Sequence, residues 1–232
     1  MKQDGPKAMK CACQHCCTVR RSIVLLPFAG APENAFASLK GEIAQVANSV
    51  EVDLAEISSD VAGGETIQTL AEKVCELLKK VPGRIVIFGH SMGALIAFEA
   101  ALRFEQERIE RLVLSACPPP DEVSAPAGEL GASFFPLDES SVSLKQPRKR
   151  SGTIVDRLER DLKILSRYVP SHATSLSIDI RVLSGASDKV APPAVTSRWA
   201  QFTTQRFEHR IFSGGHFYFV GRMPELSAAI LR

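Results

Sequence analysis

Apolar residues along the chain follow two alternating patterns. Short runs rich in β-branched residues are typical of buried strands, and longer stretches with apolar residues three or four positions apart are typical of helices. The pattern predicts strands at residues 22–27, 50–57, 84–88, 112–116, 178–184 and 206–212. It predicts helices at residues 32–47, 65–80, 92–107, 154–168, 192–201 and 223–231. Strands that alternate with helices indicate an α/β fold, in which helices flank a mostly parallel central sheet.

One long segment interrupts this alternation. Residues 117–150 contain six prolines together with several serines and glycines, and they are too many for an ordinary connection. A flexible loop is one interpretation. Apolar residues in a loop need a surface to cover, and Phe134, Phe135 and Leu137 therefore favour a short lid at about residues 117–160 that borders a substrate channel.

The composition is that of a globular domain. The chain has 232 residues, of which 45% are hydrophobic and 23% charged, with a net charge of +2. Such a balance excludes a mostly disordered chain and argues against a dedicated nucleic-acid binder. No apolar run reaches the length of a membrane-spanning helix, and the first 22 residues lack the apolar core of a secretory signal. We expect a cytoplasmic monomer with a polar tail or edge strand at residues 1–21 and one domain at residues 22–232.

The tail is rich in cysteine. Its close-set thiols and imidazole could be metal ligands, but they lack the spaced pairs of zinc sites. We expect free thiols and no metal. The residues concerned are Cys11, Cys13, His15, Cys16 and Cys17.

The strongest chemical signal is the string Gly89-His-Ser-Met-Gly93. It follows the apolar strand at residues 84–88 and begins the predicted helix at Met92. A sharp turn between strand and helix presents a serine at the carboxyl edge of a sheet, and the flanking glycines let the backbone approach closely. The motif predicts Ser91 as a nucleophile in this turn, which we call the elbow (residues 89–93).

A serine nucleophile needs a base, and a carboxylate must orient that base. His216 follows the strand at residues 206–212 through two glycines, and Asp188 follows the strand at residues 178–184. Both therefore belong to the same sheet edge as Ser91. The rival acid, Asp179, is at the amino end of its strand. The other four histidines are less suitable as the base. His15 lies in the tail and His90 inside the elbow, whereas His172 lies at the opposite edge of the sheet and His209 within a strand. The chain order Ser91, Asp188, His216 is that of an α/β-hydrolase.

An oxyanion hole for this reaction needs two backbone donors. The N–H of Met92, next to the nucleophile, is the first candidate. The second should come from the loop after the first core strand, where the N–H of Ala29 is favoured over that of Phe28.

Four segments resemble one enzyme family. They are Leu26-Pro-Phe-Ala-Gly30, Phe88-Gly-His-Ser-Met-Gly-Ala-Leu-Ile-Ala-Phe-Glu99, Asp161-Leu-Lys-Ile-Leu-Ser-Arg-Tyr168 and Gly214-Gly-His-Phe217. Together they resemble the type II, or editing, thioesterases of polyketide and nonribosomal peptide synthases. The second segment is the most specific, because Met after the serine and the Ala-Phe-Glu continuation are typical of this family and not of lipases.

The resemblance implies hydrolysis of acyl groups from the phosphopantetheine arm of acyl or peptidyl carrier proteins, without a cofactor. It carries the catalytic roles onto Ser91, Asp188 and His216, and the oxyanion roles onto Met92 and Ala29. A carboxylesterase, or a hydrolase that releases or transfers the acyl group, would use the same acyl-enzyme. A non-catalytic binding protein of the same fold is a further alternative, against which the complete triad argues.

A basic run in the predicted lid could serve such a carrier protein. It could steer an acidic partner, or it could simply be a solvated loop. The run consists of Lys145, Arg148, Lys149 and Arg150.

Overall fold

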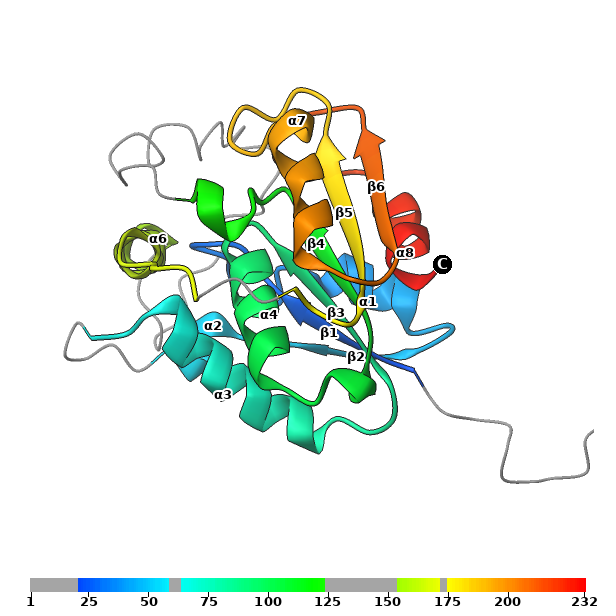
Figure 1. The fold of residues 1–232 in the computed structure, drawn as a ribbon, viewed down its shortest axis with the longest axis horizontal. Helices are drawn as coiled ribbons and strands as arrows, with labels where there is room; N and C mark the ends of the chain where they lie inside the picture. The colour runs from blue at the N-terminus through cyan, green and yellow to red at the C-terminus, as the bar shows by residue number, and fades with distance from the viewer. Residues whose placement is uncertain (1–20, 59–63, 124–153, 172–174) are drawn as a thin grey trace, which may run out of the picture.

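The computed structural model describes residues 21–58, 64–123, 154–171 and 175–232 (Figure 1). Its centre is a six-stranded sheet in the order β2-β1-β3-β4-β5-β6, in which every neighbouring pair is parallel. The strands are β1 (Ser22–Leu26), β2 (Asn48–Glu51), β3 (Ile85–His90), β4 (Ile109–Ser115), β5 (Asp179–Gly185) and β6 (Phe207–Phe212). Parallel strands need crossover connections, and these place helices on both faces of the sheet.

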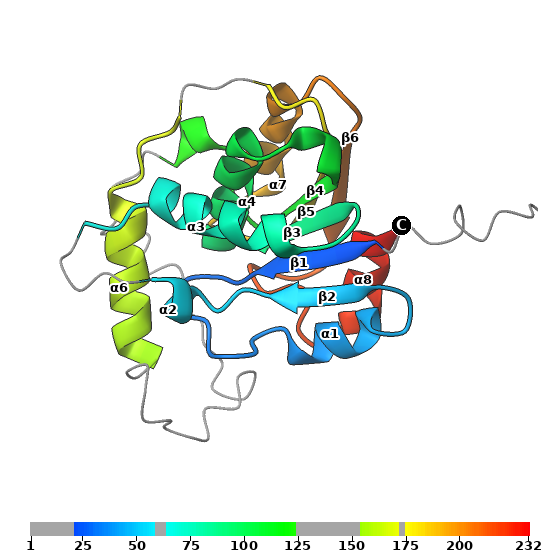
Figure 2. The same ribbon diagram turned by 90° about the horizontal axis from the view of Figure 1, so that it is seen from below.

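The helices form two layers, as Figure 2 shows: α1 and α8 lie on one side of the sheet, and α3, α4 and α7 lie on the other. Side chains alternate between the faces of a strand. In β1, Ile23 and Leu25 therefore pack with α1 and α8, whereas Val24 and Leu26 pack with α3 and α4. The helices are α1 (Ala37–Ile43), α2 (Leu54–Ile57), α3 (Ile67–Lys80), α4 (Met92–Arg103), α6 (Ile154–Ser166), α7 (Pro193–Thr196) and α8 (Met223–Leu231).

The predicted α/β architecture is confirmed, and the predicted strands and helices overlap the observed ones with one exception. Residues 50–57 were predicted as a strand, but β2 ends at Glu51 and residues 54–57 form α2. The prediction was wrong because it considered only the apolar residues of this segment and not the helix-capping residue among them. The Asp53 side chain accepts a hydrogen bond from the N–H of Ala55 at 2.8 Å and so begins a helix.

Two predicted helices are shorter than the apolar pattern indicated. The region 32–47 contains a helix only at Ala37–Ile43, since a turn precedes it. The region 192–201 contains α7 and then a 3₁₀ helix at Ser197–Phe202, whose Trp199 is fully buried against Phe98. Within the described residues, no helix is both long enough and apolar enough to span a bilayer.

Candidate active site

Ser91 lies in a strained turn between β3 and α4. Its backbone has φ 54° and ψ −120°, a conformation that costs a non-glycine residue about 1–3 kcal/mol. The N–H of Ser91 donates to the carbonyl oxygen of Ser115 at the end of β4, at 2.8 Å. Neighbouring structure thus holds the turn in place, as is common at functional sites.

The two glycines of the motif permit two close backbone approaches. A Cβ on Gly89 would lie 2.3 Å from the carbonyl oxygen of Gly93, so only glycine lets the turn fold over β3. A Cβ on Gly93 would lie 2.2 Å from the carbonyl oxygen of Leu26, so only glycine lets α4 rest on the end of β1. The predicted order of strand, sharp turn and helix is confirmed.

His216 and Asp188 meet at the carboxyl edge of the sheet. Nδ1 of His216 donates to Oδ2 of Asp188 at 2.9 Å, and both side chains are buried. The second carboxylate oxygen of Asp188 accepts from the N–H groups of Val190 at 2.8 Å and Ala191 at 3.1 Å. Burial alone would raise the pKa of Asp188, but the hydrogen bond and charge of His216, with the two N–H donors, hold it below its usual value.

Glycine also brings the loops of Asp188 and His216 together. A Cβ on Gly185, the last residue of β5, would lie 2.1 Å from the carbonyl oxygen of Gly215. Gly214 has φ 119°, and its carbonyl oxygen accepts from the N–H of Ser187 at 2.8 Å. Gly185, which leaves space for the crossing, and Gly214, with its positive φ, therefore let the loop of His216 cross directly over the end of β5.

A second Ser–His pair lies underneath the elbow. Nδ1 of His90 is 2.9 Å from Oγ of Ser115, and that hydroxyl is 2.7 Å from the hydroxyl of Tyr218. His90 and Ser115 are both 0% exposed. Burial, with the nearby charge of His216 as a smaller cause, lowers the pKa of His90 well below 6.5. This pair is inaccessible to substrate and has a phenol in place of a carboxylate, so we assign it no catalytic role. It packs beneath the elbow, where the carbonyl oxygen of Ser115 accepts from the N–H of Ser91.

The two expected oxyanion donors lie at the start of α4 and in the loop after β1. Met92 is the first residue of α4, where backbone N–H groups lack an intrahelical acceptor. Ala29 lies in the loop at residues 27–31, which follows β1 and on whose first carbonyls Gly93 rests. Both residues are buried.

A small cavity of about 90 Å³ opens beside Ser91. The segment after β4 provides half of its lining residues, and α4, α6 and the loop after β5 provide most of the others. Its lining includes Ser91, Met92, Leu95, Cys117, Leu165 and Val190. Burial raises the pKa of the Cys117 thiol, which keeps it protonated and unreactive.

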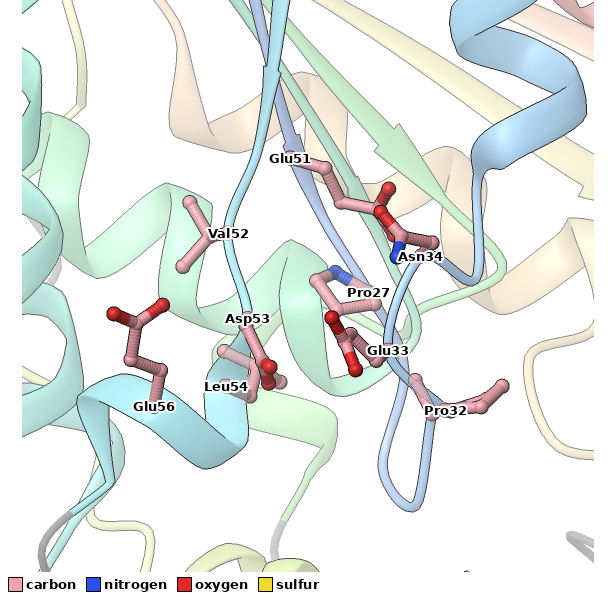
Figure 3. Close-up of a pocket in the computed structure, with 10 residues that line it drawn as sticks. Pro27, Pro32, Glu33, Asn34, Glu51, Val52, Asp53, Leu54 and Glu56 are labelled. Carbon is pink, nitrogen blue, oxygen red and sulfur yellow. The ribbon is translucent and has the colours of Figure 1, made fainter. Parts of the chain in front are cut away.

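A larger hollow of about 190 Å³ lies between the segment after β1 and the end of β2 with the residues that follow it (Figure 3). Acidic side chains line it, but two of them serve the local backbone. Glu51 accepts from the N–H of Phe36 at 2.9 Å and faces Lys40 at 3.7 Å. Asp53 caps α2. The positions of Glu51 and Asp53, two of the four acidic residues that line the hollow, are therefore explained without a ligand.

The remaining sequence predictions concern His209, a metal site, the lid, the basic run and the tail. His209 lies within β6, as predicted, and its Nε2 lies 3.0 Å from Oγ of Ser184. Among the described residues, no cluster of three or more potential metal ligands occurs. The lid residues, the basic run and the cysteine-rich tail lie outside the described residues: Phe134, Phe135, Leu137, residues 145–150 and residues 1–20.

Sequence reasoning gave no role to two buried carboxylates. Asp161 accepts from the N–H of Gly30 at 2.8 Å. Glu99 is 0% exposed and accepts from the hydroxyls of Tyr168 and Ser171. Both were part of the segments that carried the family resemblance, which was the only signal available for them.

Comparison with known proteins shows the family of this chain. The model of the thioesterase domain family matches residues 21–232. The chain belongs to that family. This thioesterase is 30% identical over 187 residues to thioesterase TesA of Mycobacterium marinum, covering 72% of this chain and 71% of TesA. It is 27% identical over 229 residues to the probable anguibactin biosynthesis thioesterase AngT of Vibrio anguillarum, covering 90% and 89% of the two chains.

A solved structure agrees with these sequence matches. The thioesterase is similar to the type II thioesterase BorB from the borrelidin biosynthetic cluster, with a TM-score of 0.73, 26% identity and 91% of each chain covered. The predicted α/β-hydrolase fold and the predicted family are both confirmed. The thioesterase is accordingly a hydrolase, and the relatives AngT and BorB belong to biosynthetic pathways, those of anguibactin and borrelidin.

Proposed function

We propose that this thioesterase hydrolyses acyl thioesters on the phosphopantetheine arm of acyl or peptidyl carrier proteins, as an editing enzyme of a polyketide or nonribosomal peptide pathway. BorB is named as a type II thioesterase from the borrelidin biosynthetic cluster, and AngT as a probable anguibactin biosynthesis thioesterase. The structurally similar YbtT is named as a type II thioesterase from the yersiniabactin NRPS/PKS pathway. A thioester on a carrier protein is the substrate that matches both these pathway names and a serine-hydrolase site.

The proposed reaction uses the residues gathered at the carboxyl edge of the sheet. The hydroxyl of Ser91 attacks the thioester carbonyl while Nε2 of His216 takes its proton. The carbonyl oxygen becomes an oxyanion and receives hydrogen bonds from the N–H groups of Met92 and Ala29. The carbon–sulfur bond then breaks, and His216 returns the proton to the departing thiol.

Deacylation repeats these steps with water. His216 takes a proton from a water molecule that attacks the ester on Ser91, and the acid departs as the serine recovers its proton. Asp188 fixes the imidazole tautomer that has Nδ1 protonated and stabilises the imidazolium that forms.

One observation carries this proposal. Asp188 and His216 form a buried hydrogen bond of 2.9 Å at the same sheet edge as the strained elbow of Ser91. The apolar cavity beside Ser91 supports it further, since Leu95, Leu165 and Val190 would accept the hydrocarbon part of an acyl group.

The test is a panel of acyl-carrier proteins that differ in acyl length and branching, with acyl-N-acetylcysteamine thioesters and aryl esters beside them. We expect hydrolysis of the carrier thioesters with the highest kcat/KM, and a loss of about 10⁴–10⁶ in kcat for Ser91→Ala. A preference for aryl esters would indicate a carboxylesterase instead. Transfer of the acyl group to an alcohol or amine would indicate a releasing or transferring enzyme.

A further inference from the structure

Asp161 connects α6 to the loop at residues 27–31. Its side chain is 3% exposed, and its Oδ2 accepts from the N–H of Gly30 at 2.8 Å, across 131 positions of sequence. A buried carboxylate that accepts from a backbone N–H forms one of the stronger hydrogen bonds in proteins. In Figure 2, α6 lies across the carboxyl ends of β1 and β2, where this loop begins.

Packing on either side of this hydrogen bond fixes the loop further. Gly30 has φ 74°, and a Cβ there would lie 2.9 Å from Cβ of Leu158, so the loop lies directly on α6. Arg157 donates to the carbonyl oxygen of Ala31 at 3.3 Å. One turn of α6 thus holds both Gly30 and its successor.

The held residue directly follows Ala29, whose N–H is the proposed second oxyanion donor. Such a donor is effective when it is about 2.7–3.1 Å from the oxyanion. The N–H of Ala29 belongs to the peptide before Ala29 and the N–H of Gly30 to the peptide after it, so a shift of Gly30 changes the backbone torsions of Ala29 and turns its N–H away. We propose that Asp161 is a positioning residue, which binds the N–H of Gly30 and thereby orients the N–H of Ala29 toward the oxyanion. This inference rests on the proposed function.

The charge of Asp161 is compatible with this position because Arg160 neutralises it. The guanidinium of Arg160 donates to Oδ1 of Asp161 at 2.8 Å and 3.0 Å. An unpaired carboxylate beside the site would oppose the developing oxyanion. With Arg160 on one oxygen and Gly30 on the other, Asp161 supplies an acceptor without a net negative charge.

The two partners also define an informative variant. In Asp161→Asn, one side-chain oxygen must serve two groups that both donate, Gly30 and Arg160. The amide NH₂ then faces one of these donors, which weakens the hold on Gly30. Removing the guanidinium with Arg160→Ala leaves the amide oxygen free to accept from Gly30, so the double variant should recover activity.

The experiment measures kcat and KM on an acyl-N-acetylcysteamine thioester, normalised to the fraction of Ser91 labelled by a fluorophosphonate. We expect Asp161→Ala to lower kcat by about tenfold or more, with KM changed by less than about twofold. Asp161→Asn should be intermediate, and Asp161→Asn with Arg160→Ala should exceed Asp161→Asn alone. If Asp161→Ala does not fold, the comparison of kcat between Asp161→Asn and the double variant tests the positioning role of Asp161.

Tyr168→Phe is the matched control. It removes a partly buried contact just after α6, the 2.8 Å hydrogen bond from Tyr168 to Glu99, without touching the loop. Its kcat should stay within about twofold of wild type. Equal losses in Tyr168→Phe and Asp161→Ala, or a loss confined to KM, would overturn the inference. An active Ser91→Ala would instead overturn the proposed function, which keeps the two failures distinct.

Discussion

Gly93 rests on Leu26 so closely that a Cβ on Gly93 would lie 2.2 Å from the Leu26 carbonyl oxygen. This approach joins the start of α4 to the end of β1, and the next residues of the chain form the loop that carries Ala29. This backbone contact therefore links the position of the Ser91 turn to that of the proposed oxyanion loop.

Gly93→Ala should destabilise the protein because the added methyl group meets backbone and cannot be accommodated by a side-chain rotation. We expect the free energy of unfolding to fall by about 1–3 kcal/mol or more, together with a large loss of kcat. Urea denaturation measures the first quantity. Gly41→Ala is the matched control, since Gly41 lies in α1 with no atom within 4 Å of its added Cβ, and it should stabilise by about 0.5–1 kcal/mol.

Asp188→Asn should lower kcat by about 10⁴ while KM changes little. The N–H groups of Val190 and Ala191 hold one oxygen of this side chain, so the amide NH₂ of the variant turns toward His216. Nδ1 must then accept a hydrogen bond, and Nε2 carries the proton and cannot act as the base.

Asp179→Asn provides the comparison for that prediction. Asp179 begins β5 at the opposite edge of the sheet and accepts a 3.3 Å bond from the N–H of Arg206. Steady-state kinetics should show kcat within about twofold of wild type. If the two aspartate variants lost activity equally, Asp188 would not be the orienting acid.

His90 should make folding sensitive to acid. Its pKa in the folded protein is well below 6.5, so below pH 6.5 the unfolded chain binds a proton that the folded chain does not. The free energy of unfolding should therefore decrease as the pH falls through 6.5, by about 1.4 kcal/mol per pH unit for this group. Urea denaturation at pH 7.5 and 5.5 should show a smaller decrease for His90→Gln than for wild type, and identical decreases would contradict the assignment.

The basic run should affect carrier proteins and not small substrates. Changing Lys145, Arg148, Lys149 and Arg150 to Glu should raise KM for an acyl-carrier protein by about tenfold, because an acidic partner would be repelled instead of steered. Turnover of an acyl-N-acetylcysteamine thioester should stay nearly constant. Equal effects on both substrates would indicate damage to the site, and no effect on either would leave the run without a docking role.

The sequence by itself determined the fold class and predicted the nucleophile, base and acid that the proposed function uses. Apolar periodicity reflects which face of each element is buried, and that is a local property of the chain. The elbow could be predicted because strand, turn glycines and helix are contiguous around Ser91. The roles of Asp188 and His216 could be inferred because parallel strands bring all their carboxyl ends to one edge.

Only the tertiary structure decided which groups meet at the carboxyl edge of the sheet. The hydrogen bond between Asp161 and Gly30 joins residues 131 positions apart, and no local pattern specifies such a pair. The helix at residues 54–57 was missed because a single capping bond from Asp53 outweighed the apolar run around it. The glycine contacts at Gly93 and Gly185 likewise depend on backbone from another strand or loop, so the sequence marks these glycines while the packed chain supplies the atoms that require them.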